Sequence, residues 1–425
     1  MGSELLEIIK FVEDYKHYKD DRLALISSEN TSSRLLRSSY LMGLSDQYCS
    51  RLPEEADKIG NLAFGNIQTL DRVNAMTRAI VQEVFKAEEC DVRLLSGLSG
   101  LTVLLFSLFE NGDTMYKMYD LHGGHLSVKP IAERLNLNIV EMLLGKDYHF
   151  DLKDFEEKWK RNPAKTIFLD SSYVLFPYPL KEISEIVGDD VTIMYDASHM
   201  VALIAGGMFQ EPFAEGADII HSTAHKSMWG PQKSIILFKE KGELSDRVHH
   251  MVKDVLVSNT HMHHIFALYI AMAEFKEFGR EYARSIYNNA KALADNLQSN
   301  GVEIAAKEYG YTESNQFWID FDTQRDAIAN FQKLEKLGVS SNVIFLPGNR
   351  WGLRIGVNSI TRLGAREGDM KILARIMSDL FNNRKDTVKL KKELYEFKGD
   401  LGGIKYSFDD TVQAREIMDF IINNF

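Results

Sequence analysis

The chain has 425 residues, of which 45% are hydrophobic and 26% charged, a balance typical of a soluble globular protein with about two or three domains. Its formal net charge of −11 argues against a general affinity for nucleic acid or anionic membranes, because both need basic patches. It has two cysteines, no apolar run near the roughly 18 residues of a membrane span, and no secretory signal, so we expect a cytoplasmic protein.

The N-terminal part of the chain is predicted to be helical. Apolar residues recur at helical spacing in 4–16, which predicts an arm helix, and in 66–87, which predicts an amphipathic helix. A turn of small residues, Ser96-Gly97-Leu98-Ser99-Gly100, then opens an apolar helical run at 101–109. Free backbone N–H groups and the positive end of the helix dipole make such a turn a ready site for phosphate.

Strands alternate with helical segments through the middle of the chain. They are predicted at 115–119, 138–142, 166–169 and 234–238, as in a sheet built from βαβ units. The first of them leads into Leu121-His122-Gly123-Gly124-His125, whose glycines allow a ligand to approach the backbone closely. For a lone histidine, a hydrogen-bonded core position is the competing interpretation.

Two further buried strands are predicted at 191–195 and 217–221. Polar residues follow each of them. Because ligands bind at the carboxyl ends of the strands in an open α/β sheet, we expect these polar residues to share one crevice. They are Asp196, His199, Thr223, His225 and Lys226.

An acid and an amine buried in one crevice suit pyridoxal phosphate. The amine of Lys226 would bond to the cofactor's aldehyde, and the carboxylate of Asp196 would keep the pyridine nitrogen protonated so that the ring accepts electrons. Taken alone, the pair also has an ordinary interpretation, because short motif matches are often false. In that interpretation Asp196 caps the next element and Lys226 is a solvated loop amine.

The C-terminal third is predicted to form a smaller α+β domain. Before it, a helix is predicted from Ile265 to about Asn300, with a break near Gly279. The elements predicted after Gly301 are strand 316–321, helix 325–337, strand 352–357 and helix 367–381. Arg354 stands inside the apolar strand WGLRIGV. A buried arginine needs a fixed anionic partner, which is either a ligand carboxylate or an internal acid.

Longer motifs help to decide between these interpretations. They are SSEN at 27–30, LHGGH at 121–125, YDASHMVALIAGG at 195–207, STAHKSMWGP at 222–231 and GLRIGVNSITRLG at 352–364. Together they resemble the serine hydroxymethyltransferase family, in the family's order and over most of the chain. The resemblance implies the α/β fold of the fold-type I pyridoxal phosphate transferases. We therefore expect a mixed, mostly parallel seven-stranded sheet in a large domain, plus a smaller α+β C-terminal domain.

The resemblance also implies a domain organisation and a dimer. We expect an N-terminal arm at 1–45, a large cofactor-binding domain at 46–285 and a small domain at 286–425. Family members form homodimers whose active sites are shared across the interface, and Tyr48 matches a tyrosine that reaches into the neighbouring site. The expected partners are an amino acid and an aldehyde or folate, with no nucleic acid, membrane or metal.

Roles for individual residues follow from the resemblance alone. The catalytic residues would be Lys226, Tyr48, His125 and Asp196, with His125 stacked on the pyridine ring. Ser28, Tyr48 and Arg354 would bind the substrate, with Arg354 holding its α-carboxylate. The other cofactor-binding residues would be Ser96, Gly97, Leu98, Ser99, Ser171, His199, Thr223, His225, Asn259 and Thr260.

Two departures from the family pattern bear on the reaction. Ser50 stands where the family has a glutamate that manages protons in folate chemistry, and Phe64 replaces a tyrosine. The use of tetrahydrofolate therefore stays open. Retro-aldol cleavage of a β-hydroxy amino acid would either pass formaldehyde to tetrahydrofolate or release and exchange another aldehyde, as an aldolase or transaldolase does. Chemistry at the Cα–H bond and a non-catalytic dimeric scaffold are further alternatives.

A third departure is the segment that begins with Asn259 and Thr260, which replace a Gly-Gly pair of the family. His261, His263 and His264 follow, which raises the question of a metal site. Spacing of i, i+2 and i+3 at the start of a helix is not expected to bring three imidazoles to one point, and no carboxylate or cysteine stands beside them. We therefore expect these residues to line the dimer interface or the substrate entrance instead.

Overall fold

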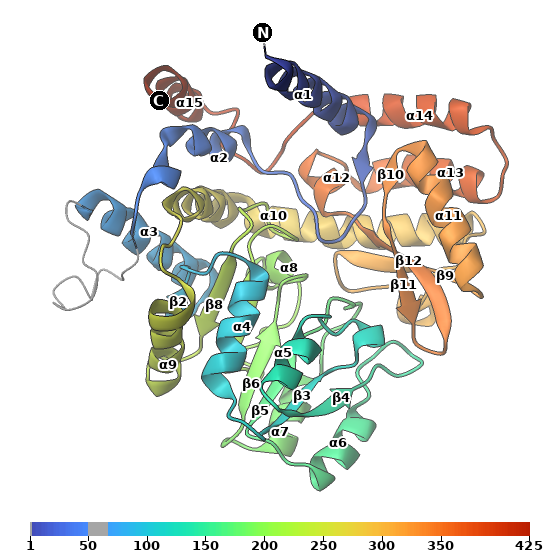
Figure 1. Ribbon diagram of the computed structural model, residues 1–425. Coiled ribbons are helices and arrows are strands. Elements are labelled where there is room, and N and C mark those ends of the chain that lie inside the picture. The colour runs from blue at the N-terminus through green and yellow to red at the C-terminus, as the bar shows by residue number, and fades with distance from the viewer. Residues whose placement is uncertain (1, 50–66) are drawn as a thin grey trace.

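Seven strands form the large sheet of the computed structural model, which describes residues 2–49 and 67–425 (Figure 1). Their order is β2-β8-β7-β6-β5-β3-β4, and β8 runs antiparallel to both of its neighbours while the other pairs are parallel. The strands are β2 (Glu89–Asp91), β3 (Thr114–Met118), β4 (Asn138–Met142), β5 (Thr166–Leu169), β6 (Thr192–Asp196), β7 (Ile219–Thr223) and β8 (Ser234–Phe238). The expected mixed, mostly parallel sheet is confirmed. Ser50 and Phe64 lie outside the described residues.

Helices cover both faces of this sheet, so its strands are apolar on both sides. Alternate strand residues point into two separate cores. One core includes Met115, Phe168, Met194, Ile219 and Ile236. The other includes Tyr116, Ile167, Ile193, Ile220 and Ile235. The covering helices are α3 (Gln68–Phe85), α4 (Gly97–Leu108), α5 (Val128–Arg134), α6 (Leu152–Arg161), α7 (Leu180–Val187), α8 (Val201–Ala205) and α9 (Glu243–Met251).

The edge strand β2 was not expected from the sequence, because two of its three residues are acidic. Both acids are buried in ion pairs: Arg78 lies 2.7 Å from Glu89, and Arg93 lies 2.6 Å from Asp91. Since an unpaired buried carboxylate would be costly, these two arginines are what allows the strand to join the sheet.

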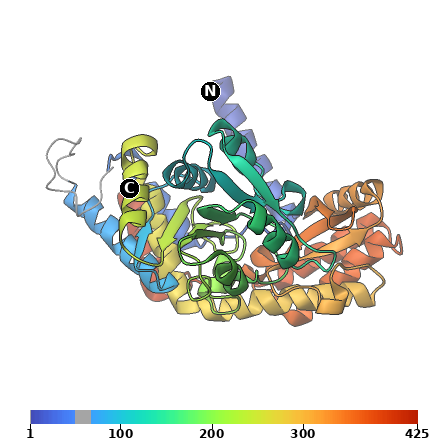
Figure 2. The same cartoon turned by 90° about the horizontal axis from the view of Figure 1, so that it is seen from below.

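A single long helix, α10 (Met262–Ser299), extends from the large sheet to the smaller one (Figures 1 and 2). The break expected near Gly279 is wrong, since the helix is continuous for 38 residues. Glycine inside a helix costs only about 1 kcal/mol. Here its missing side chain is needed, because a Cβ at Gly279 would lie 2.4 Å from the ring of Phe275.

The C-terminal part contains a three-stranded antiparallel sheet of order β11-β12-β9. Its strands are β9 (Gln316–Phe321), β11 (Asn342–Leu346) and β12 (Arg350–Gly356). The accompanying helices are α11 (Gln324–Leu337), α12 (Asn358–Arg362), α13 (Glu367–Phe381), α14 (Thr387–Asp400) and α15 (Val412–Asn424). The division of the chain at 45 and 285 stays a proposal, since α10 runs unbroken across the second boundary.

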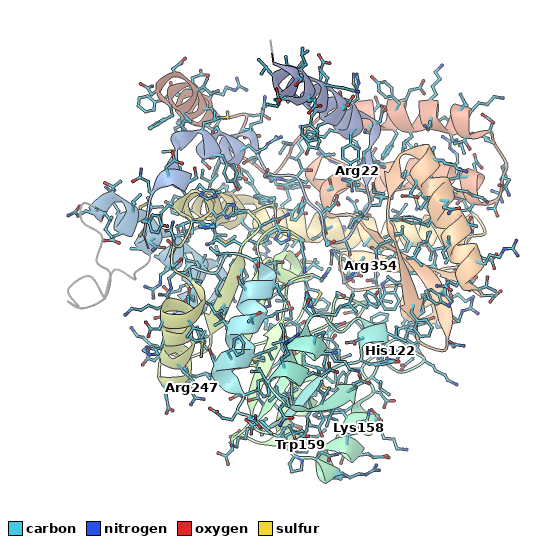
Figure 3. All side chains as sticks on the ribbon, viewed as in Figure 1. Arg22, His122, Lys158, Trp159, Arg247 and Arg354 are labelled. Atoms are coloured by element: carbon cyan, nitrogen blue, oxygen red, sulfur yellow. The ribbon has the colours of Figure 1, made fainter. Side chains whose placement is uncertain are left out.

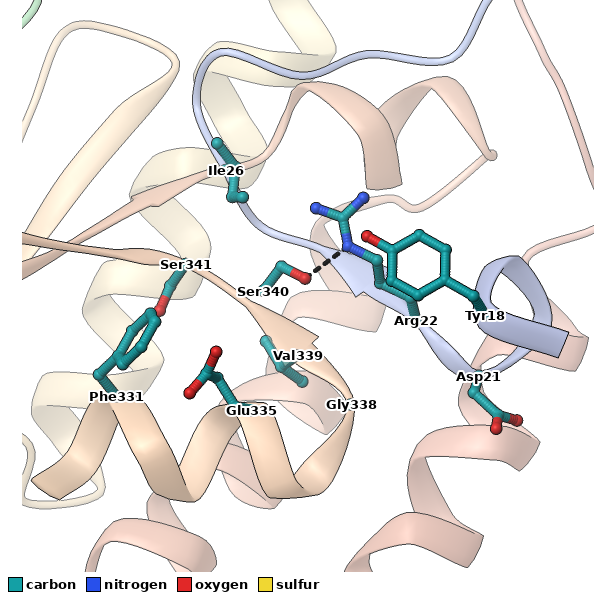
Figure 4. Close-up of a pocket in the computed structure, with 10 residues that line it drawn as sticks. All are labelled: Tyr18, Asp21, Arg22, Ile26, Phe331, Glu335, Gly338, Val339, Ser340 and Ser341. Carbon is teal, nitrogen blue, oxygen red and sulfur yellow. Dashed lines mark hydrogen bonds between the residues drawn. The ribbon is translucent and has the colours of Figure 1, made fainter. Parts of the chain in front are cut away.

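The N-terminal arm consists of helix α1 (Ser3–Asp21) and strand β1 (Leu23–Ala24), followed by α2 (Arg34–Ser38). β1 pairs in parallel with β10 (Val339–Ser340), and Arg22 Nε donates a hydrogen bond to Ser340 Oγ beside an open pocket of about 450 Å³ (Figure 4). These contacts fasten the end of the arm to the C-terminal part. Among the described residues, no helix combines the length and apolar character needed to cross a membrane.

Candidate active site

The carboxyl ends of β6 and β7 bring two chemical groups together. Asp196, the last residue of β6, is paired in register with His221 of β7. The Ser198 N–H donates to Asp196 Oδ1 at 2.8 Å, and His221 Nδ1 lies 3.3 Å from Asp196 Oδ2. His221 was not selected from the sequence. Its place at the end of a predicted strand that neighbours the Asp196 strand is the signal that could have found it.

Asp196 keeps its charge although it is only 6% exposed. Burial by itself raises the pKa of this carboxyl, but His221, Lys226 and the Ser198 N–H outweigh burial and lower the pKa well below its ordinary value. Asp196 is therefore a buried negative charge at the carboxyl end of β6, and it can hold a proton on a cationic ring nitrogen.

Lys226 lies five residues after His221 and remains partly accessible to solvent. Burial lowers the pKa of its amine below the ordinary value, attraction to Asp196 partly offsets this, and repulsion by Arg354 adds to the lowering. Lys226 thus lies within electrostatic reach of both Asp196 and Arg354. A lysine with a lowered pKa has more of its amine in the neutral, nucleophilic form.

The start of helix α4 lies against the same crevice. Ser96 Oγ accepts the Ser99 N–H at 3.1 Å, and Ser99 Oγ accepts the Ser96 N–H at 2.9 Å, which forms a capping box. A Cβ at Gly97 would lie 2.5 Å from Thr223 Cγ2, and one at Gly100 would lie 2.7 Å from His221 Nε2. The glycines therefore let this helix end sit directly over β7, where its N–H groups can bind a phosphate.

The loop after β3 places His125 beside Asp170. His125 and Met118 donate their backbone N–H groups to the two carboxylate oxygens of Asp170, at 3.0 and 2.7 Å. Burial lowers the pKa of His125, so the imidazole is neutral at pH 7. Its Nδ1 accepts the Ser127 N–H at 3.3 Å, which leaves the proton on Nε2. His125 therefore presents a flat, neutral ring with an N–H donor.

Arg354 in β12 lies where the small sheet borders the large one (Figure 3). It is 8% exposed, and its guanidinium donates to Asn342 Oδ1 at 3.2 Å and to the Ser172 carbonyl at 3.0 Å, 5.3 Å from the centre of the Tyr173 ring. Burial lowers the pKa of Arg354 to about 10. Within the described ranges no carboxylate forms an ion pair with it, so its charge is available to an anionic ligand.

The turn that contains Ser28 contacts Gly356 and Ser227, which follow Arg354 and Lys226 in the chain. A Cβ at Gly356, two residues after Arg354, would lie 2.3 Å from Ser27 Cα. Asn30 Nδ2 donates to the Ser227 carbonyl at 2.9 Å. Ser28 is half-buried at this position, as a substrate contact would require.

Several buried polar atoms around the crevice have no hydrogen-bond partner among the described residues. Such atoms are costly unless a ligand or water completes them. They include Ser27 Oγ, Ser198 Oγ, His199 Nδ1, Thr223 Oγ1 and His225 Nδ1. These atoms, the helix end and the Lys226–Asp196 pair fit pyridoxal phosphate. Ser171, which is also buried, instead bonds locally, with its Oγ accepting the Tyr173 N–H at 3.0 Å.

Three of the expected residues, Tyr48, Asn259 and Thr260, have other surroundings. Tyr48 is 57% exposed. Asn259 Oδ1 accepts the Cys49 N–H at 3.0 Å, and the Thr260 N–H donates to the Cys49 carbonyl at 3.1 Å. Asn259 and Thr260 thus fasten the segment before α10 to residues 47–49.

The three histidines that follow do converge, so the expectation from their spacing is wrong. One nitrogen from each of His261, His263 and His264 lies within 4.8 Å of the other two. The cause is the backbone at His261, which precedes α10 with a φ of +52° and turns its ring toward the first turn of the helix.

A lysine with a lowered pKa, a buried acid and the start of α4 at the large sheet, with Arg354 on the small sheet, are the features expected of a fold-type I pyridoxal phosphate enzyme. The chain belongs to the serine hydroxymethyltransferase family, whose model matches residues 3–377. It is a pyridoxal phosphate-dependent enzyme of the hydroxymethyltransferase and aldolase type, as the resemblance implied. Enzymes of this family act on amino acids.

Similar proteins cover almost the whole chain. It is 31% identical to a serine hydroxymethyltransferase of Methanopyrus kandleri over 97% of both chains. It is 31% identical to that of Archaeoglobus fulgidus over 95% of this chain and 93% of the relative. A solved structure of L-threonine transaldolase from Pseudomonas fluorescens, in its internal aldimine state, has a TM-score of 0.93 and 27% identity over 99% of this chain and 98% of the other.

Proposed function

We propose that the enzyme breaks and forms the Cα–Cβ bond of a β-hydroxy-α-amino acid, exchanging aldehydes without tetrahydrofolate. The observation that carries the proposal is that Lys226 lies within electrostatic reach of both Asp196 and Arg354, so that the three groups could together bind pyridoxal phosphate and an amino acid. When bound, pyridoxal phosphate supplies a ring that accepts the electron pair left on Cα.

Arg354 is proposed to bind the α-carboxylate of the amino acid. Its guanidinium is held by Asn342 and the Ser172 carbonyl, so the unused N–H groups have a fixed direction. A planar guanidinium binds a carboxylate through two parallel hydrogen bonds. Together with Ser28, this clamp would fix the orientation of Cα, and therefore which of its bonds breaks.

Lys226 is proposed as the covalent attachment point for the cofactor, and Asp196 as the partner of its ring nitrogen. The neutral amine attacks an aldehyde, whereas the ammonium form cannot. Asp196, which His221 keeps ionised, holds the proton on the pyridine nitrogen. Retro-aldol cleavage then moves the β-hydroxyl proton to a base, converts the hydroxyl-bearing carbon to an aldehyde, and leaves the electron pair of the broken bond on Cα.

His125 is proposed to lie flat on one face of the ring. Because its Nδ1 accepts the Ser127 N–H, the ring offers an N–H at Nε2 and not a lone pair, which suits stacking and hydrogen-bond donation better than proton abstraction. The base for the β-hydroxyl proton is then left to Tyr48 of the neighbouring subunit or to water.

Two sequence positions support aldehyde exchange. Ser50 cannot act as the acid or base that the family's glutamate supplies in folate chemistry, and Phe64 lacks a phenol. One similar solved structure is that of a threonine transaldolase. Hydroxymethyl transfer to tetrahydrofolate is the second candidate, favoured by the 31% identity to enzymes with that name.

We also propose a homodimer with shared active sites. Helix α1 has no buried residue, although Leu5, Ile8, Phe11 and Val12 are apolar and between 46% and 67% exposed. A contiguous apolar surface of this kind is typical of an interface. Tyr48 is exposed in the single chain and would reach the neighbouring site across this interface.

A cytoplasmic location is part of the proposal. The two cysteines, Cys49 and Cys90, are buried thiols and do not form a disulfide, as a reducing compartment favours.

The experiment supplies the holoenzyme with threonine, serine or glycine, with and without tetrahydrofolate, and with a second aldehyde as acceptor. We expect acetaldehyde from threonine in the absence of folate, and a new β-hydroxy amino acid when the acceptor is present. Turnover of serine that depends strictly on tetrahydrofolate, with no release of acetaldehyde, would replace aldehyde exchange by hydroxymethyl transfer.

A further inference from the structure

Three histidines meet at the N-terminal end of α10, outside the amino acid crevice described above. The distances between ring centroids are 4.2 Å for His263 and His264, 5.6 Å for His261 and His263, and 6.1 Å for His261 and His264. One nitrogen from each ring lies within 4.8 Å of the others. We propose that His261, His263 and His264 form a binding site for a late transition-metal dication such as Zn²⁺.

The nitrogen atoms of this cluster are available as ligands. Nδ1 of His263 and Nδ1 of His264 are buried and have no hydrogen-bond partner among the described residues. Burial lowers the pKa of all three histidines, that of His264 to about 4, so their rings are neutral at pH 7. A neutral imidazole with an unused lone pair is the form that binds a metal.

The backbone under the cluster is already fixed on both sides. Before it, Thr260 bonds to the Cys49 carbonyl, and the buried Lys233 amine donates to the Thr260 carbonyl at 3.1 Å. After it, His263 and His264 lie on the first turn of α10. The centroid of the Tyr40 ring is 6.0 Å from the ring centroid of each histidine.

Little movement is needed to bind an ion here. Tetrahedral zinc with Zn–N bonds of about 2.0 Å needs nitrogen atoms roughly 3.3 Å apart. Rotation of the side chains on a fixed backbone supplies this small contraction.

Two nearby positive groups oppose a cation but are too weak to exclude it. Lys233 is buried, which lowers its pKa to about 7, so its amine is partly neutral at that pH. The positive end of the α10 dipole lowers the affinity for a cation by at most about thirtyfold at a partly buried site. Three imidazole ligands contribute far more than this to the affinity for zinc.

The ligand set also indicates the class of metal. Three nitrogens suit Zn²⁺, Cu²⁺, Ni²⁺ or Co²⁺, whereas Mg²⁺ and Ca²⁺ prefer oxygen. No carboxylate or cysteine joins the group within the described part of the chain. The bound ion therefore keeps its positive charge and an open fourth position, which would take water or an anionic group.

The test uses holoenzyme freed of metal with a chelator and titrated with Zn²⁺ against a chromophoric competitor. Co²⁺ serves as a second probe, because its visible absorption reports four-coordinate geometry. We expect one ion per chain. His264→Ala and His263→Asn should each weaken binding by about 100-fold or more, since loss of a residue that only orients a ligand already costs about 10-fold to 100-fold. The matched control is His250→Ala on α9, whose side chain is 78% exposed and pairs with Asp254; this variant should bind as the parent does.

Cofactor absorbance and the thermal unfolding midpoint are measured for each variant, so that loss of metal is separated from loss of fold. His263→Asn keeps a polar side chain at its position and covers the case in which His264→Ala fails to fold. The proposal is overturned if no stoichiometric ion binds, or if folded variants bind Zn²⁺ as tightly as the parent. Binding of inorganic phosphate with no dication would also overturn it.

Discussion

His221 Nδ1 lies 3.3 Å from Asp196 Oδ2, and both residues are buried on neighbouring strands, His221 within β7 and Asp196 at the end of β6. The register between β6 and β7 pairs the two positions directly, so the contact is set by the sheet itself. His221 and Lys226 together lower the pKa of Asp196 against the effect of burial. We interpret His221 as a positioning residue that keeps the carboxylate ionised and directed toward the cofactor nitrogen.

Replacing His221 by Leu should lower kcat by about tenfold, because a rise of one unit in the pKa of Asp196 corresponds to about 1.4 kcal/mol. KM for the amino acid should change little, since His221 is not proposed to touch it. The measurement is steady-state kinetics together with a pH titration of the cofactor absorbance. His221→Asn, which retains a donor, should recover part of the loss. An unchanged kcat and titration in His221→Leu would refute the positioning role.

Replacing Arg354 by Lys should raise KM for the amino acid by about 10-fold to 100-fold, because a lysine cannot reproduce two parallel hydrogen bonds to a carboxylate. Substrate titrations of the cofactor spectrum measure the effect. Arg350→Lys is the matched control on the same strand, since Arg350 pairs with Asp320 at 2.8 Å near the surface. Equal effects of the two substitutions would speak against a substrate role for Arg354.

Lys226→Ala should abolish the visible band of covalently bound cofactor, and Tyr48→Phe should reduce turnover while keeping that band. If the sites are shared across a dimer, mixing the two impaired variants should restore up to about a quarter of the parent activity, because random pairing places one intact site in half of the dimers. Activity of mixtures is compared with that of each variant alone. No recovery in proven heterodimers would contradict the shared site.

Replacing Glu274 by Ala should destabilise the fold by about 3–5 kcal/mol, because it leaves the guanidinium of Arg362 buried and unpaired. The two groups are 2.8 Å apart and neither side chain is exposed. Arg362 also lies 3.8 Å above the Trp229 ring, so it cannot move easily into water. Chemical denaturation measures the change. Glu277→Ala, at an exposed position of the same helix, should have little effect.

Stability should rise with pH above neutrality through Lys233. Burial lowers its pKa to about 7 in the folded protein, against an ordinary value of 10.5, so the unfolded chain binds more protons between these values. The free energy of unfolding therefore increases with pH in this window. Between pH 7 and 9 the parent should gain about 2 kcal/mol over Lys233→Met. A constant difference between the two proteins, measured by denaturation at both pH values, would show that the amine does not titrate in this range.

Most strands of the large sheet were predictable, because short continuous apolar runs bounded by turns are typical of buried strands. Thus 138–142, 166–169 and 234–238 were predicted with the observed bounds. The short strand β2 was missed because its acids are neutralised by Arg78 and Arg93, which come from outside it. The break predicted at Gly279 failed because the contact that requires this glycine, with Phe275, exists only in the packed helix.

The sequence by itself determined the sheet, the family and the main residues of the cofactor crevice, since these depend on runs of residue types and on motifs that lie together in the chain. Only the tertiary structure decided which polar groups meet. Strand register set His221 against Asp196, and a left-handed turn brought His261 to His263 and His264. The physical reason is that distances between side chains depend on register, backbone turns and packing among distant segments, which local patterns do not encode.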